Sequence, residues 1–295
     1  YHSFSSNFKI MQKNKRMEEF PLLDSNKGIP LFLPKISVSG ISSVTKTLNT
    51  RWIGQGPKVD KFEKIFKKKF LKNKLEALAV GSGTDALHLA YLLADIKRGD
   101  EVLAPVFTCT ATNLPLLYIG AKPVFLDIDP ITMNINLDNI EKKITKKTKA
   151  IMPVHLSGIP ANLREIKKIC KKYKLILIED AAHAFGTKYF NKFIGTIGDV
   201  GVFSLHPRKN FHVLGDGGLI VTNNTALYKK LKILRNHGLV RRDETIIWGT
   251  NSRLDNLQAA FGNIMLKKIK SINKRQLDIS KIYDSKLKNF VELPI

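Results

Sequence analysis

Short apolar runs alternate with longer stretches of helical periodicity between Glu76 and Thr222. The runs have the length of buried strands, and the stretches between them place apolar residues on one face of a helix. In residues 162–173 that face is clear, and Asn162 followed three residues later by Glu165 is typical of a helix start. Strands are therefore expected at 77–80, 101–104, 122–127, 150–154 and 175–178, and helices at 82–94 and 162–173.

The repeated strand–helix–strand order predicts an α/β fold, with a mostly parallel central sheet covered by helices on both faces. After Asp180 the pattern changes to a hairpin, two short strands and two helices, expected at 187–195, 199–204, 218–222, 226–236 and 254–287. Ligands of such sheets bind beyond the carboxyl ends of the strands. The candidate site therefore lies in the segments that follow strands, at 81–84, 105–113, 180–183 and 204–210.

Charge and composition exclude several classes of protein. The 295 residues are 43% hydrophobic, enough for a sizeable core, and 49 Lys and Arg against 25 Asp and Glu give a net charge of +24. The 39 lysines are scattered without interleaved aromatic residues, so we expect a solvated basic surface and no nucleic-acid partner. No apolar run approaches the roughly 18 residues of a membrane-spanning helix, and residues 1–20 lack the pattern of a secretory signal.

Two cysteines exclude a disulfide framework and a four-cysteine metal site. A cytoplasmic location without a membrane partner is the resulting expectation.

Residues 81–84 read Gly-Ser-Gly-Thr between an expected strand and an expected helix. Free N–H groups at a helix start can cradle a phosphate, although these residues alone fit a tight turn better. Asp180 ends a buried strand, where a carboxylate needs a positive partner such as a protonated ring nitrogen. His183 could hydrogen-bond another edge of the same ring, although a lone histidine is more often structural.

Lys209 lies in a short loop beside Arg208. A lysine that is partly desolvated beside another cation has a lowered pKa and becomes a usable amine nucleophile, although alone Lys209 is one lysine of many. Residues 215–218, Gly-Asp-Gly-Gly, permit either a close backbone approach or a hairpin turn. A phosphate cradle, a reactive lysine and a carboxylate for a ring nitrogen together match one cofactor, pyridoxal 5′-phosphate.

From about residue 29 to about residue 275 the sequence resembles the DegT/DnrJ/StrS family of sugar aminotransferases, which belongs to the fold type I pyridoxal phosphate enzymes. The shared motifs occur in order at 52–59 (Trp-Ile-Gly-Gln-Gly-Pro-Lys-Val), 82–87 (Ser-Gly-Thr-Asp-Ala-Leu), 120–124 (Gly-Ala-Lys-Pro-Val), 179–183 (Glu-Asp-Ala-Ala-His), 209–210 (Lys-Asn), 215–218, 235–238 (Arg-Asn-His-Gly) and 251–254 (Asn-Ser-Arg-Leu). The resemblance implies three parts: an N-terminal extension at 1–28, a large cofactor-binding α/β domain at 29–250, and a long helix with the start of an incomplete small C-terminal domain at 251–295.

The resemblance also implies the catalytic residues. Lys209 would bond covalently to the cofactor aldehyde, Asp180 would pair with the pyridine nitrogen, and His183 would approach the phenolic oxygen. Cys109 stands where the family usually places an aromatic residue over the cofactor ring, and the nearest aromatic residue is Phe107.

The phosphate would be held by Gly83 and Thr84, with help from Ser204. The resemblance implies a homodimer with a shared active site, in which Asn251 reaches the phosphate from the neighbouring subunit and Arg253 is a second candidate for that role.

By the same resemblance, the protein would transfer an amino group from L-glutamate to a nucleotide-linked keto-deoxysugar in a two-stage cycle, with residues 52–59 near the substrate. Surface polysaccharide such as O-antigen is the commoner use of such sugars. Two alternatives stay open. One is a non-catalytic or regulatory homologue that binds pyridoxal phosphate, and the other is a sugar dehydratase, in which a histidine replaces the lysine at position 209.

Overall fold

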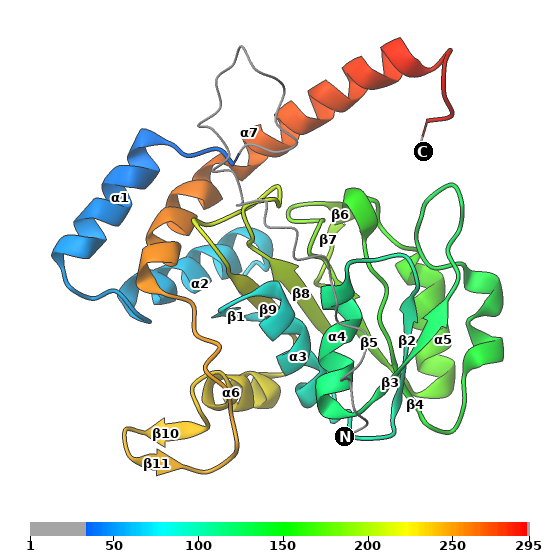
Figure 1. Cartoon of the computed structure of the whole chain (residues 1–295), viewed down its shortest axis with the longest axis horizontal. Helices are drawn as coiled ribbons and strands as arrows, with labels where there is room; N and C mark the ends of the chain where they lie inside the picture. The colour runs from blue at the N-terminus through cyan, green and yellow to red at the C-terminus, as the bar shows by residue number, and fades with distance from the viewer. Residues whose placement is uncertain (1–33, 294–295) are drawn as a thin grey trace, which may run out of the picture. The chain divides into compact units, whose positions relative to one another are not determined.

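The structure, a computed structural model, describes residues 34–293, so the expected extension at 1–28 lies outside the described residues. The helices and strands described below all belong to one compact unit that begins at Ile36. A seven-stranded sheet forms its centre (Figure 1). Its strands are β1 (Glu76–Val80), β2 (Glu101–Pro105), β3 (Lys122–Leu126), β4 (Thr148–Ile151), β5 (Ile176–Asp180), β8 (Val200–Ser204) and β9 (Gly218–Thr222).

The strand order is β1-β9-β8-β5-β4-β2-β3. Only β9 runs against its neighbours: it pairs antiparallel with both β1 and β8, and the remaining pairs are parallel. Six of the seven strands therefore point the same way, and their carboxyl ends lie at one edge of the sheet. The prediction of a mostly parallel α/β sheet is confirmed.

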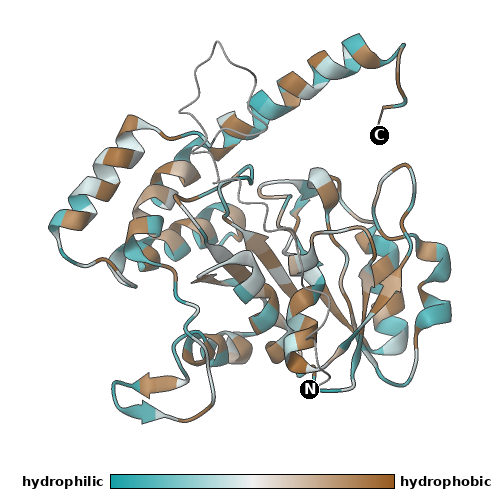
Figure 2. Ribbon diagram, viewed as in Figure 1, coloured by the Kyte–Doolittle hydropathy of each residue, from teal (hydrophilic) through white to brown (hydrophobic). Residues whose placement is uncertain are grey.

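Side chains that alternate along each strand belong to two separate cores. In β1, Ala77 and Ala79 join one core, whereas Leu78 and Val80 join the other. Helices α2 (Pro57–Phe70), α5 (Leu163–Tyr173) and α7 (Asn256–Leu287) supply the first core, and α3 (Gly83–Leu93), α4 (Thr110–Ile119) and α6 (Thr225–Leu234) supply the second. Figure 2 accordingly shows central strands that are mostly hydrophobic. A sheet buried on both faces requires the near-continuous apolar runs seen in the sequence.

Local capping fixes where several helices begin and end. The Ser82 side chain accepts a hydrogen bond from Asp85 N at the start of α3. Asn162 accepts one from Glu165 N at the start of α5, which the sequence predicted. Helix α4 ends at Gly120, whose φ of +79° suits glycine. Strand β4 begins two residues and ends three residues earlier than expected.

Two hairpins and the long helix α7 complete the fold. The hairpin expected at 187–195 is formed by β6 (Lys188–Tyr189) and β7 (Lys192–Phe193), and a second hairpin pairs β10 (Leu239–Arg241) with β11 (Glu244–Thr245). Helix α7 packs against α2 and against α1 (Val38–Asn49). The sequence did not predict α1, α2, α4 or the second hairpin. The proposed domain boundary at residue 250 stays a prediction.

Among the described residues, no helix combines the length and the apolar character that crossing a bilayer would require.

Candidate active site

The four predicted segments lie at one edge of the sheet, because each follows one of the strands that point the same way. Strands β1, β5 and β8 point the same way, so the residues that follow Val80, Asp180 and Ser204 lie at carboxyl ends on the same edge, although β9 separates β1 from β8. Asp180 is the last residue of β5 and is only 2% exposed. The topology therefore brings together motifs that are more than 100 residues apart in the sequence.

The Asp180 carboxylate is held at both oxygens. Its Oδ1 accepts a hydrogen bond from Ala182 N at 3.0 Å, and its Oδ2 accepts one from the Thr112 hydroxyl at 2.9 Å. Both donors are neutral, and within residues 34–293 the buried Asp180 carboxylate has no cationic hydrogen-bond partner. A bound cation would complete its environment.

Lys209 lies in the turn after β8, where its N–H donates to His206 O at 2.9 Å. Burial lowers the pKa of the Lys209 amine; nearby Arg208 also lowers it, whereas Asp180 and Cys109 act to raise it. The lowered pKa means that a larger fraction of this amine is unprotonated at neutral pH than for an ordinary lysine. Lys209 therefore has the properties of an amine nucleophile.

His183 is half-buried next to these groups. Burial lowers its pKa, nearby Lys209 lowers it further, and Asp180 opposes both. Its Nδ1 accepts a hydrogen bond from Ser157 N at 3.3 Å, so the neutral ring carries its proton on Nε2. Ser157 has a φ of +52°, an uncommon conformation for a residue other than glycine. The arrangement leaves Nε2–H available to donate to a ligand oxygen.

Two of the residues predicted to cradle a phosphate, Gly83 and Ser204, lie in close contact. A Cβ at Gly83 would fall 2.9 Å from Ser204 Cβ and 3.1 Å from its Oγ. Gly83 and Thr84 open α3, and N–H groups in the first turn of a helix have no acceptor within the helix. The cradle therefore combines free donors, a hydroxyl group and the positive end of a helix dipole.

The 215–218 motif contacts the loop before α3 through Gly218. A Cβ at Gly218 would lie 2.2 Å from Ser82 O, so only glycine permits this approach of β9 to the loop before α3. The motif thus acts through packing.

Two other predicted positions lie close by. Cys109 caps α4 and is exposed, and it lies near enough to Lys209 to affect the pKa of that amine. Phe107 is 53% exposed.

Asn251 and Arg253 lie beside the same chain's cradle loop. Arg253 forms a β-bridge with Val80, and Ser252 O accepts a hydrogen bond from Gly81 N at 2.9 Å. The Asn251 and Arg253 side chains are exposed and bond to each other, with 3.0 Å between Oδ1 and Nε. Their action on a partner subunit stays a prediction.

The motif at 52–59 is tied to the start of α7. Buried Asn256 accepts from Lys58 N at 2.8 Å, and its Nδ2 donates to Trp52 O at 3.0 Å. The segment is therefore anchored, while the Trp52 side chain remains 55% exposed.

Sequence reasoning singled out neither of two supports of the site, although Thr112 lies in the predicted segment at 105–113. Thr112 contacts Asp180, and buried His155 contacts Glu179, the residue before Asp180. The strand alternation separates the two adjacent acids, because side chains of neighbouring strand residues face opposite sides of the sheet. That alternation was the one available signal that only one of them belongs to the site.

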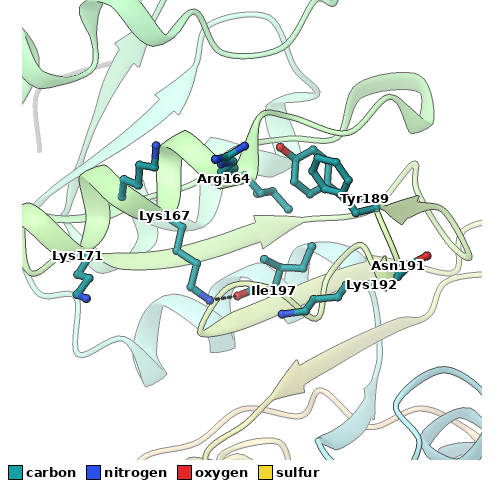
Figure 3. A pocket seen from close by; sticks show the side chains of 10 residues that line it. Arg164, Lys167, Lys171, Tyr189, Asn191, Lys192 and Ile197 are labelled. Atoms are coloured by element: carbon teal, nitrogen blue, oxygen red, sulfur yellow. Dashed lines mark hydrogen bonds between the residues drawn. The ribbon is translucent and has the colours of Figure 1, made fainter.

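A groove of about 540 Å³ lies elsewhere, between α5 and the β6–β7 hairpin (Figure 3). Tyr189 and Phe190 line it, with Arg164, Lys167 and Lys192 among its cations. None of the residues predicted to bind cofactor or to act in catalysis lines this groove. It is separate from the candidate active site.

The chain belongs to the DegT/DnrJ/EryC1/StrS aminotransferase family, whose model matches residues 34–294. It is 37% identical over 271 residues to GDP-perosamine synthase of Escherichia coli O157:H7, covering 90% of this chain and 73% of that protein. It is 45% identical over 184 residues to the pleiotropic regulatory protein of Geobacillus stearothermophilus, covering 62% and 50%. The solved structure of NtdA from Bacillus subtilis with bound cofactor PMP is similar with a TM-score of 0.81 and 32% identity, covering 92% of this chain and 66% of that one.

The family is pyridoxal phosphate-dependent, and the fold is that of fold type I aminotransferases. The residues present fit this cofactor. A lysine amine with a lowered pKa, a buried carboxylate and a glycine–serine pair at a helix start match an aldehyde, a ring nitrogen and a phosphate, respectively.

Proposed function

We propose that this protein is a pyridoxal phosphate-dependent aminotransferase that moves an amino group from L-glutamate to a nucleotide-linked keto-deoxysugar. One observation carries the proposal: the Lys209 amine, the Asp180 carboxylate and the His183 ring lie within electrostatic reach of one another at the sheet edge that also holds the Gly83–Ser204 cradle. When bound, the cofactor carries the amino group between the two substrates and withdraws electrons from the carbon that bears it.

Lys209 is the proposed base and acid. Its lowered pKa leaves the amine able to take a proton from the carbon that bears the amino group and to return it to a neighbouring carbon. The same nitrogen would bond to the cofactor aldehyde at rest. A histidine here, as in a dehydratase, would lack that amine.

Asp180 and His183 would orient the ring. The Asp180 carboxylate would keep the ring nitrogen protonated, and His183 Nε2–H would donate to the phenolic oxygen. Gly83, Thr84 and Ser204 would hold the phosphate.

The dimer is part of the proposal. Asn251, with Arg253 beside it, would reach the phosphate of the neighbouring subunit in a homodimer. Both side chains are exposed and so are accessible to a second copy of the chain. Cys109 would lie next to the cofactor ring in place of an aromatic residue.

The substrate class rests on the relatives. GDP-perosamine synthase acts, by its name, in making a nucleotide-linked amino sugar. The net charge of +24 suits a substrate that carries a diphosphate. Two free cysteines support a cytoplasmic setting.

The test is incubation of the protein with pyridoxal phosphate, L-glutamate and a panel of nucleotide keto-sugars, with the products read by mass. We expect one sugar to gain an amine in place of its keto oxygen, and we expect Lys209→Ala to abolish the reaction. Lys281→Ala on the exposed end of α7 is the matched control. Cofactor binding without turnover of glutamate would favour a regulatory protein, and loss of a sugar hydroxyl without amine transfer would favour a dehydratase.

A further inference from the structure

Thr112 contacts the Asp180 carboxylate directly from a neighbouring helix. It lies in the first turn of α4, is 2% exposed, and its hydroxyl oxygen is 2.9 Å from Asp180 Oδ2. An ionised carboxylate only accepts hydrogen bonds, so the threonine hydroxyl must be the donor.

Because the Thr112 hydroxyl has only one proton, its bond to Asp180 also fixes the direction of the hydrogen bond between Thr108 and Thr112. Thr108 Oγ lies 2.8 Å from Thr112 Oγ, and geometry alone leaves either hydroxyl as the donor. Since the Thr112 proton is used for Asp180, Thr108 must donate to Thr112. The result is a directed chain from Thr108 through Thr112 to Asp180, in which each bond polarises the next.

The helix turn that carries Thr112 is itself anchored. The Tyr91 hydroxyl, fully buried in α3, donates to Thr112 O at 2.8 Å. On the other side, Ala182 N donates to Asp180 Oδ1 at 3.0 Å. With one donor at each oxygen, rotation of the carboxylate would break a bond at both ends.

We propose that Thr112 is a positioning residue that orients the Asp180 carboxylate toward the cofactor's ring nitrogen, with Thr108 polarising its hydroxyl. This inference rests on the proposed function. Thr112 acts through Asp180 only, so its contribution should depend on whether the ligand has a ring nitrogen.

The experiment compares two ligands on the apo protein by equilibrium binding. One is pyridoxal phosphate, and the other is its 1-deaza analogue, in which carbon replaces the ring nitrogen. Thr112→Val keeps the shape of the side chain and removes the donor. We expect it to raise the dissociation constant of pyridoxal phosphate roughly tenfold or more, the range for a hydrogen bond to a charged group, and to leave that of the analogue within about twofold.

Thr112→Ser should restore binding of pyridoxal phosphate to within about threefold, because it restores the hydroxyl. Thr108→Val should weaken binding in the wild-type background but not in the Thr112→Val background, since the chain is already broken there. Thr222→Val is the matched control: that buried hydroxyl donates to Asp199 O, away from Asp180.

Equal weakening of both ligands by Thr112→Val, or no weakening of either, would overturn the positioning role. If Thr112→Val does not fold, Thr108→Val gives the same comparison between the two ligands, because it removes the other hydroxyl of the chain. A wild-type protein that binds neither ligand would instead refute the proposed function, and the positioning role with it.

Discussion

His155 and Glu179 form a wholly buried pair directly behind the site, with 3.2 Å between Nε2 and Oε2. His155 Nδ1 accepts a hydrogen bond from Ala161 N, so the ring proton lies on Nε2. The Nε2–H group therefore donates the hydrogen bond to Glu179 Oε2. Glu179 also accepts hydrogen bonds from three backbone N–H groups, those of Gly195, Ile197 and Gly198. The pair thus fixes the end of β5, where Asp180 lies, to the loop before β8.

Glu179→Gln should destabilise the fold by about 2–3 kcal/mol at neutral pH, because it replaces a charged acceptor of buried hydrogen bonds with a neutral amide. Burial alone would raise the Glu179 pKa, but the hydrogen bonds from His155 and from the Gly198 and Gly195 N–H groups outweigh it and leave the pKa below its ordinary value of 4.5. The stabilisation is therefore complete above about pH 4.5 and is lost as the pH falls through the lowered value.

Urea unfolding of wild type and Glu179→Gln at a series of pH values measures this difference. The gap between the two proteins should narrow on acidification. Glu165→Gln, at a partly exposed acid on α5, should stay near wild type. A gap that is constant with pH would contradict the assignment of the stabilisation to the Glu179 carboxylate.

Arg235→Met should cost about 3–5 kcal/mol, because it leaves Glu63 buried without its cation. The Arg235 guanidinium lies 2.9 Å from Glu63 Oε1 and donates to Ala79 O at 2.6 Å, which clamps β1. Burial raises the Glu63 pKa and Arg235 partly offsets this, so the defect should grow as the pH rises and Glu63 ionises.

Denaturant unfolding across pH tests the clamp, with exposed Arg241→Met as the control. Glu63→Gln in the Arg235→Met background should recover part of the stability, since Gln keeps an acceptor for Ala79 N. If the double variant is no more stable than Arg235→Met, the buried charge is not the cause.

The two cysteines should differ sharply toward a thiol reagent. Burial raises the pKa of the Cys170 thiol to about 12, with Asp199 adding to the effect, whereas Cys109 is exposed beside the site. Iodoacetamide followed by peptide mapping should label Cys109 alone in the native protein, and pyridoxal phosphate should slow that labelling. Equal labelling with and without cofactor would place Cys109 away from the bound ring.

Gly83→Ala should weaken pyridoxal phosphate binding about tenfold, because the new methyl group would crowd Ser204 and the phosphate cradle. Pyridoxal, which lacks the phosphate, is the matched ligand and should lose little affinity. The dissociation constants of the two ligands are compared between wild type and Gly83→Ala. An equal loss of affinity for both ligands would indicate a general distortion of the protein and would contradict a phosphate site at Gly83.

Much of the fold follows from the apolar runs alone, because a doubly covered sheet demands them. Helix α1 does not: its Ser- and Thr-rich sequence has low helix propensity, and packing against α7 sustains it. There Gly40 lies so close to Phe261 that a Cβ would fall 2.6 Å from the ring. Such tertiary contacts are not visible in a single sequence.

The candidate site divides in the same way. Lys209, Asp180, His183 and the cradle could be predicted, because each follows a strand whose end faces the same edge. Thr112 lies in the predicted segment at 105–113, but its contact with Asp180 could not be predicted, because α4 contains Pro115 and shows no clear periodicity, and the contact spans 68 residues. The residue pattern of one chain also cannot show which side chains would act in the site of a second subunit.

Borohydride reduction of the cofactor-loaded protein, followed by peptide mapping, tests the central claim most directly. The account predicts one reduced pyridoxyl group, located on Lys209, and its absence from Lys209→Ala. A label on another lysine, or no label on fully loaded protein, would contradict it.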